Sequence, residues 1–150
     1  MSQAADHDGV TLHASCVALG PSGLLITGAS GSGKSSLALM LMAYGARLVA
    51  DDATLVQCSK GALWASCPET IRGRIEARGI GILAADPQER ARLVAAVDLD
   101  RTESERLPPE RSITIAGHDI PLILNVPGLS FAAGLIQYLK GQSFKETRIS

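Results

Sequence analysis

The stretch G-A-S-G-S-G-K-S at residues 28–35 decides the fold of this chain. It fits the phosphate-binding pattern G-x-x-x-x-G-K-[ST] at every fixed position. A short apolar run precedes it at residues 24–27, and a helix-forming segment follows it at residues 36–43. A strand, a glycine loop and a helix start in this order aim backbone N–H groups and the positive end of a helix dipole at one anion. The pattern therefore predicts a site for nucleotide phosphates.

Each residue type in the loop has an expected part in binding. The glycines allow positive φ and a close approach of the backbone to phosphate oxygens. Lys34 is expected to reach the β- and γ-phosphates, and the Ser35 hydroxyl is expected to hold Mg²⁺. A flexible loop that matches by chance is disfavoured, because a strand and a helix flank it. The predicted nucleotide-binding residues are Gly28, Ala29, Ser30, Gly31, Ser32, Gly33, Lys34, Ser35 and Ser36.

Length and composition favour one globular domain in the cytoplasm. The chain has 150 residues, of which 46% are hydrophobic and 19% charged. A net charge of −1 gives no reason to expect nucleic acid or an anionic membrane surface as a partner. We see neither a membrane-spanning apolar run nor a signal peptide. The three cysteines (Cys16, Cys58 and Cys67) lack a C-x-x-C spacing and are expected to be small buried apolar residues.

The predicted elements form an α/β domain at residues 10–140, between a flexible tail at residues 1–9 and a polar, frayed end at residues 141–150. Strands are expected at residues 10–18, 24–27, 47–50 and 93–99, and β-hairpins at residues 54–66 and 112–124. A helix is expected at residues 35–44, where Gly45 ends it, and a short one after Asp86-Pro87.

The remaining segments have less regular patterns. Residues 68–73 are expected to be helical or irregular, residues 74–83 to form a loop-and-strand element, and residues 101–111 to form an exposed loop. A last helix is predicted from apolar side chains that share one helical face. They are Leu129, Ala132, Ala133, Ile136 and Leu139.

Two carboxylates, Asp51 and Asp52, follow the predicted strand at residues 47–50. Asp52 comes 18 residues after Lys34, which leaves room for one helix and a tight turn in a compact βαβ unit. Ligands of parallel α/β sheets bind at the carboxyl ends of the strands, so these acids should lie at the edge of the phosphate site. Adjacent strand residues point to opposite faces, so only one aspartate is expected to face the γ-phosphate. It would hold Mg²⁺ or accept a proton; the alternative is a solvated acid pair that caps a turn.

Three further charged or titratable residues are candidates for the site. His13 lies on the strand-like stretch before the loop, where a lone histidine is more often structural than catalytic. Glu76 and Arg78 lie within an apolar, glycine-bearing segment, and this placement favours a site over a solvated surface. A local ion pair between Glu76 and Arg78 is the alternative.

Together these blocks resemble the HPr kinase/phosphorylase family, bacterial enzymes that phosphorylate the phosphocarrier protein HPr on a serine. His13 lies 21 residues before Lys34, and the glycine loop is followed by L-V-A-D-D at residues 48–52 and I-E-A-R-G-I-G-I-L at residues 75–83. The last block is similar to the family signature E-x-R-G-x-G-I, which ordinary P-loop proteins do not share. Order and spacing agree over residues 10–140.

The resemblance implies a P-loop α/β core with a distant likeness to PEP carboxykinase, with additional β-hairpins and a hexameric assembly. It implies ATP and Mg²⁺ as cofactors and an HPr-like phosphocarrier as the partner. By position, Lys34 and Ser35 would bind phosphates and Mg²⁺, and Glu76 would be a second Mg²⁺ ligand. The catalytic residues implied are Asp52 (or, failing that, Asp51) as the proton acceptor, His13, Lys34 and, by a looser alignment, Arg106.

The chain departs from the family pattern in three places. It resembles the short form, which has the catalytic domain alone. Ser36 stands where the family usually has an acidic residue. Leu129, in P-G-L-S at residues 127–130, replaces the arginine of a P-G-R-N-like stretch used in dephosphorylation. A leucine cannot neutralise phosphate, so we expect kinase activity with weak or absent phosphorolysis.

Two other functions stay open at this point. A small-molecule kinase would need an arginine-bearing lid, for which Arg101, Arg106 and Arg111 are spaced suitably along one loop. A nucleotide-sensing regulatory module without transfer activity is the second alternative, and Ser36 and Leu129 leave room for it.

Overall fold

A computed structural model of the chain describes residues 9–68 and 72–148, and the side chains up to residue 142. Its elements are β1 (Val10–Leu12), β2 (Ala14–Leu19), β3 (Ser22–Thr27), α1 (Lys34–Ala43), β4 (Arg47–Ala50), β5 (Thr54–Ser59), β6 (Ala62–Ser66), β7 (Arg74–Ala77), β8 (Gly81–Ala84), β9 (Arg90–Thr102), β10 (Ser112–Ile115), β11 (His118–Asn125) and α2 (Ser130–Arg148). Among the described residues, neither helix is both long enough and apolar enough to cross a membrane.

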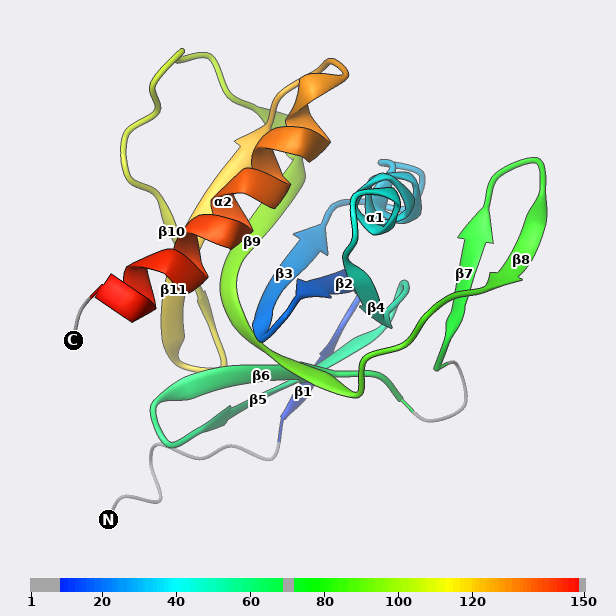
Figure 1. Ribbon diagram of the computed structural model, residues 1–150, viewed down its shortest axis with the longest axis horizontal. Helices are drawn as coiled ribbons and strands as arrows, with labels where there is room; N and C mark the ends of the chain where they lie inside the picture. Colours follow the sequence, from blue (N-terminus) through cyan, green and yellow to red (C-terminus); the bar gives the residue numbers. More distant parts are fainter. Residues whose placement is uncertain (1–8, 69–71, 149–150) are drawn as a thin grey trace.

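A mixed nine-stranded sheet organises the molecule and confirms the α/β class (Figure 1). Its main path runs β1-β5-β6-β9-β3-β2-β4. Strand β11 pairs with the part of β9 that lies beyond its pairing with β6, and β10 pairs with β11. The predicted unit of strand, helix and strand is β3–α1–β4, but the antiparallel strand β2 lies between β3 and β4. Because β2 is antiparallel to both, β3 and β4 run in the same direction. Their carboxyl ends, which carry the glycine loop and the acid pair, therefore meet at one edge of the sheet.

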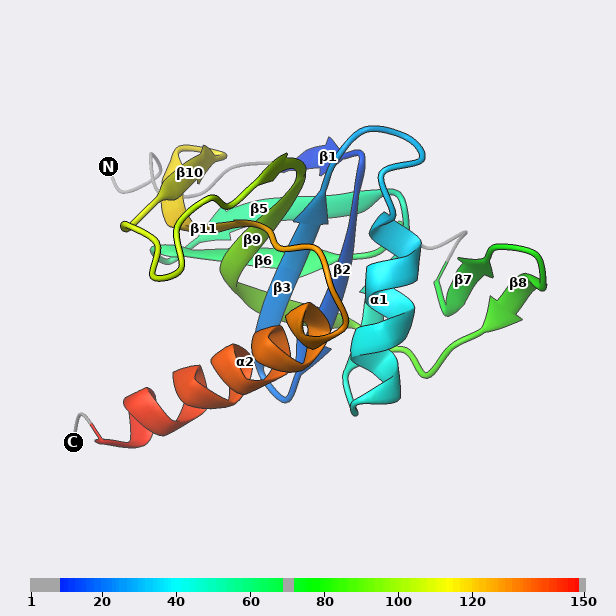
Figure 2. The same ribbon diagram turned by 90° about the horizontal axis from the view of Figure 1, so that it is seen from above.

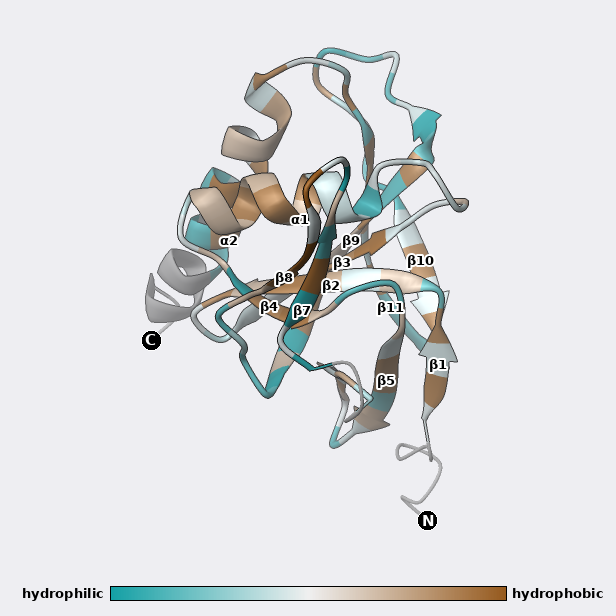
Figure 3. Ribbon diagram, turned by 90° about the vertical axis from the view of Figure 1, so that its right-hand side faces the viewer, coloured by the Kyte–Doolittle hydropathy of each residue, from teal (hydrophilic) through white to brown (hydrophobic). Residues whose placement is uncertain are grey.

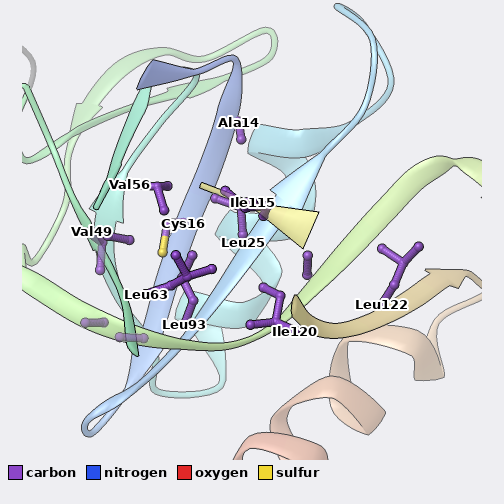
Figure 4. Packing of buried hydrophobic residues seen from close by; sticks show 14 of the residues in the cluster. Ala14, Cys16, Leu25, Val49, Val56, Leu63, Leu93, Ile115, Ile120 and Leu122 are labelled. Atoms are coloured by element: carbon purple, nitrogen blue, oxygen red, sulfur yellow. The ribbon is translucent and has the colours of Figure 1, made fainter. Parts of the chain in front are cut away.

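The central strands β2 and β3 are covered on both faces, and this explains why each is almost continuously buried. On one face, Cys16 and Leu25 pack with Val56 and Leu63 of the β5–β6 hairpin (Figure 4). On the other face, residues of β2 and β3 pack against the two helices, which lie together on that side of the strands (Figure 2). The glycine loop and the acid pair are thus attached to strands that are held from both sides.

Helix α1 is fixed to the sheet by a small set of buried side chains, of which Leu41 is fully buried. We expect Leu41→Ala to lower the free energy of unfolding by about 3 kcal/mol, because it removes buried methyl groups and leaves a cavity. Met40 on the same helix is 38% exposed, so Met40→Ala is the matched control and should cost much less. Denaturant unfolding of both variants measures the difference. Equal losses would contradict this account of the packing.

Several predicted elements are confirmed and others need correction. The hairpins at residues 54–66 and 112–124 are present, and the three cysteines are buried and free. The predicted first strand is broken at His13 into β1 and β2. Part of the stretch at residues 68–73, namely residues 69–71, lies outside the described residues.

The helix predicted after Asp86-Pro87 is wrong. The backbone of residues 86–88 pairs instead with Leu48 of β4: Leu48 N–H donates to Asp86 O at 3.0 Å, and Gln88 N–H donates to Leu48 O at 2.9 Å. Edge pairing with β4 uses the hydrogen-bonding groups that a helix would need, and β9 begins soon afterwards at Arg90.

The last helix is confirmed, but its buried face differs from the prediction. Ala132, Ile136 and Leu139 are buried, whereas Ala133 is exposed and Leu129 precedes the helix with 86% exposure. Leu135 completes the buried set. The helix also continues to Arg148, through residues that we assigned to a frayed end.

The loop after β9 is closed at its base by an ion pair between Glu103 and Arg111. Arg111 donates two parallel hydrogen bonds to the Glu103 carboxylate, at 2.9 and 3.1 Å. These hydrogen bonds lower the pKa of Glu103 below its ordinary value.

The lowered pKa predicts a pH-dependent contribution to stability. The contribution is present above the carboxyl pKa of the unfolded chain and is lost as the pH falls through the lowered folded pKa. Wild type should therefore exceed Glu103→Gln in free energy of unfolding at neutral pH, and the difference should vanish in acid. Glu110→Gln, at an exposed position of the same loop, is the control for the loss of a carboxylate. A difference between wild type and Glu103→Gln that is constant with pH would contradict the prediction.

Candidate functional site

A cavity of about 280 Å³ lies at the sheet edge where the glycine loop (residues 28–35) meets the acid pair. Its walls come from the loop and the start of α1, from the residues after β4, and from the β7–β8 hairpin. The lining residues are Ser30, Gly31, Gly33, Lys34, Ser35, Ser36, Asp51, Asp52, Glu76 and Arg78. The structure thus brings together residues that the sequence analysis predicted separately.

The glycine loop has the backbone conformation that its sequence predicts. Gly31 has φ 83° and Gly33 has φ 105°, and both values lie in the left-handed region that favours glycine. Gly33 is the N-cap of α1, so the first N–H groups of the helix face the cavity end of the loop. Lys34 is only 5% exposed, and its Nζ donates to Gly28 O at 2.9 Å and to Ala29 O at 3.2 Å. This arrangement can bind an anion.

Not every loop residue faces the cavity. A Cβ at Gly28 would collide with Ser32 Oγ, which is itself buried and has no hydrogen-bond partner among the described residues. The Ala29 N–H donates to both carboxylate oxygens of Asp100, at 3.0 and 3.1 Å. Gly28, Ala29 and Ser32 are therefore absent from the lining, and their predicted part in binding stays a prediction. Asp100 was missed because it lies 71 residues away in sequence, at the end of β9.

Asp51 connects three elements around the cavity. Its Oδ1 accepts hydrogen bonds from Ser35 Oγ at 2.7 Å and from Ser15 Oγ at 2.8 Å. Its Oδ2 accepts a hydrogen bond from the Glu76 N–H at 3.2 Å. Asp51 thereby holds the start of α1, strand β2 and strand β7 in fixed positions relative to one another.

Asp52 faces the cavity in a different way. Its Oδ1 lies 3.4 Å from His13 Nδ1, and His13 Nε2 lies 3.2 Å from Ser30 Oγ. The side chains of His13 and Asp52 are 53% and 65% exposed, so both are accessible from solvent. Asp52 presents a carboxylate with an accessible oxygen, which is what a proton acceptor needs.

Both aspartates line the cavity, and our expectation that only one of them faces the γ-phosphate stays a prediction. The side-chain alternation of a strand does not apply here, because β4 ends at Ala50. Asp52 then adopts φ 68°, and the chain turns there before it enters β5. The alternative of a solvated acid pair that only caps a turn does not account for the bond between Asp51 and Ser35.

Glu76 and Arg78 are supplied by the β7–β8 hairpin. Figure 3 views the molecule from the side of this hairpin, where hydrophilic and hydrophobic residues alternate along β7. Ile75 and Ala77 are buried, so Glu76 lies on the exposed face with the lining residue Arg78 beyond it. This alternation confirms a strand within the segment that we predicted as a loop-and-strand element.

Arg106 is not brought to the cavity. It is exposed in the loop between β9 and β10 and is absent from the lining residues. Its predicted catalytic role therefore stays a prediction.

None of the three buried cysteines is among the residues that line the cavity. Burial raises the pKa of the Cys16 thiol to about 12. Burial also raises the pKa of the Cys67 thiol, so both remain protonated at neutral pH. The residues that line the cavity offer oxygen and nitrogen groups.

Comparison with known proteins relates this chain to a described family. Residues 6–88 match the model of the HPr serine kinase C-terminal domain. The chain is 38% identical over 128 residues to the HPr kinase/phosphorylase of Xanthomonas campestris pv. campestris and, at the same identity, to that of Xanthomonas oryzae pv. oryzae. These alignments cover 79% of this chain and 40% of each relative, so the chain spans less than half the length of these curated relatives.

A solved structure agrees with the sequence matches. The HPr(Ser) kinase/phosphatase of Coxiella burnetii superposes with a TM-score of 0.74 at 26% sequence identity. The superposition covers 92% of this chain and 99% of that one. The family model matches more than half of the chain and includes the glycine loop, the acid pair and Glu76. The chain therefore belongs to the HPr kinase/phosphorylase family.

Proposed function

We propose that this chain is the catalytic domain of an ATP-dependent HPr serine kinase, with a P-loop core of the PEP-carboxykinase type. The observation that carries the proposal is one cavity that gathers an anion-binding loop, the Ser35–Asp51 pair and an accessible carboxylate at Asp52. A phosphoryl transfer needs a phosphate site, a metal site and an acceptor for the hydroxyl proton. The cavity offers residues for all three.

The donor set fits Mg²⁺. Ser35 Oγ and the Asp51 carboxylate lie 2.7 Å apart, and Glu76 is among the residues that line the same cavity. Mg²⁺ prefers oxygen ligands and is usually held by one or two carboxylates together with phosphates and water. We assign Ser35 and Glu76 as its ligands, with Asp51 supporting Ser35. When bound, Mg²⁺ would neutralise charge on the phosphates of ATP.

The proposed transfer follows from the positions of Lys34 and Asp52. Lys34 neutralises phosphate charge at the loop, after exchanging its carbonyl partners for phosphate oxygens. The Asp52 carboxylate takes the proton of the acceptor serine, and His13 beside it orients that carboxylate. A bond forms between the serine oxygen and the γ-phosphorus, the bond from that phosphorus to the bridging oxygen breaks, and ADP leaves with the electron pair.

Mass spectrometry of HPr after incubation with the chain, ATP and Mg²⁺ tests the proposal. We expect one added phosphate on a serine of HPr. An unmodified HPr, with ATP still bound by the chain, would overturn the proposal. A panel of nucleosides, nucleotides and sugars in the same assay would then separate a small-molecule kinase from a nucleotide sensor without transfer activity. A hexameric assembly and a cytoplasmic location are proposed from the family alone.

Phosphorolysis is expected to be weak or absent, because Leu129 offers no charge to phosphate. Leu129 is exposed in the segment between β11 and α2. Release of pyrophosphate from phosphoserine-HPr and inorganic phosphate should be slow in wild type. The variant Leu129→Arg should be faster, with Leu107→Arg at another exposed leucine as the control. Rapid turnover by wild type would contradict the expectation.

A further inference from the structure

Ser15 is a buried polar residue that bridges the two aspartates of the cavity. It lies on β2 and is fully buried. Its Oγ donates to Asp51 Oδ1 at 2.8 Å and accepts from the Asp52 N–H at 3.1 Å. A serine hydroxyl has one proton to donate and lone pairs that accept. The Ser15 hydroxyl therefore donates its proton to Asp51, and a lone pair of the same oxygen accepts the hydrogen bond from the Asp52 N–H.

The bond to the Asp52 N–H matters because the backbone there is unusual. Asp52 has φ 68°, in the left-handed region that residues other than glycine adopt uncommonly, although aspartate enters it more readily than most. Ser15 Oγ binds the backbone of this turn, and His13, two residues earlier in the chain, lies against the Asp52 carboxylate. One short segment of chain thus contacts Asp52 at both its backbone and its side chain.

The hydroxyl of Ser15 takes no part in the backbone hydrogen bonds of the sheet. The backbone of Ser15 lies opposite Ile26 of β3, and β2 pairs with β4 from Cys16 to Ala18. Its neighbours Ala14, Cys16 and Val17 are buried without making any bond to the acid pair. The polar atom of Ser15 is therefore directed at the site.

We propose that Ser15 is a positioning residue for phosphoryl transfer: its hydroxyl fixes the Asp52 carboxylate relative to the Ser35–Asp51 pair. This proposal rests on the proposed kinase function, and it adds a residue that touches neither substrate nor metal. Ser15 acts by fixing the position of the Asp52 carboxylate relative to the hydroxyl of the acceptor serine of HPr. The turn at Asp52 depends on a bond that the Ser15 side chain supplies.

The test compares Ser15→Ala with Thr54→Val, which serves as the matched control. Thr54 is also fully buried, and its Oγ1 donates to Ala14 O at 2.7 Å, so its loss removes a neighbouring buried hydroxyl that contacts neither aspartate. We expect Ser15→Ala to lower kcat for HPr phosphorylation by about 10- to 100-fold with KM for ATP unchanged. Losses of this size are typical when a residue that orients a metal ligand through a hydrogen bond is removed. Thr54→Val should keep the wild-type kcat.

Amide hydrogen exchange gives a readout that does not depend on activity. The Asp52 amide should be protected in wild type and in Thr54→Val, and its exchange should be faster in Ser15→Ala. A wild-type kcat in Ser15→Ala, equal losses of kcat in both variants, or unchanged exchange at Asp52 would each overturn the proposal. Absence of transfer by the wild-type protein would instead overturn the kinase function, and the exchange measurement would still report on the Ser15 bridge.

Discussion

Lys34→Ala is expected to lower kcat/KM for ATP-dependent phosphorylation of HPr by about a hundred- to a thousand-fold. Lys34 is the cation buried in the glycine loop, where it is 5% exposed and lines the cavity. A positive charge in a partly dry site stabilises developing charge on the phosphates far more than one in water. The measurement is the initial rate of phosphoserine formation on HPr, followed by mass spectrometry.

The control for this variant is Lys140→Ala. Lys140 is exposed on α2 and is not among the residues that line the cavity. It should therefore retain the wild-type rate. A Lys34→Ala protein that folds normally and still transfers phosphate at the wild-type rate would show that the glycine loop is not the phosphate site.

Asp52→Asn is expected to lower kcat by about a hundred- to ten-thousand-fold while ATP binding is retained. The asparagine keeps the shape of the side chain but cannot take the proton of the acceptor serine. Asp51→Asn should act differently, because Asp51 accepts the hydrogen bond of Ser35 and so supports the Mg²⁺ site. Its main effect should be weaker binding of ATP in the presence of Mg²⁺.

Calorimetric titration of ATP with Mg²⁺, together with single-turnover transfer to HPr, separates the two effects. The pair of variants also assigns the proton acceptor, since the sequence alone left Asp51 and Asp52 as alternatives. Loss of transfer with retained ATP binding in Asp51→Asn, and not in Asp52→Asn, would reverse the assignment.

Local patterns predicted much of the fold and most residues of the cavity. Residues 28–35 indicate a strand, a loop and a helix because glycine, lysine and serine stand at fixed positions, and β3 and α1 confirm this order. The acid pair was predicted from its spacing to Lys34, which a single helix and a turn can bridge. Glu76 was predicted from the apolar, glycine-bearing segment around it, whereas His13 gained weight only from the order of the blocks along the chain.

The features that escaped prediction depend on contacts between distant segments. Asp100 reaches Ala29 because β9 runs parallel to β3, a pairing that no short stretch of sequence encodes. The segment at Asp86-Pro87 has the local pattern of a helix start, yet tertiary pairing with Leu48 prevails. Ser15 gave no signal, since a single serine within an apolar strand has many structural explanations.

Strand β2 also raises a question of register. In a strand with one solvent-exposed face, a register shift of one residue would move the apolar side chains into solvent. The free-energy cost of exposing them fixes the strand register. Residues 14–18 are all buried, so hydrophobic alternation distinguishes poorly between one register and the next. A slip would, however, remove the Ser15 hydroxyl from Asp51 and from the Asp52 N–H and leave a buried polar group unpaired. The Ser15 hydroxyl therefore favours the observed alignment of β2 with β4, the strand that the acid pair follows.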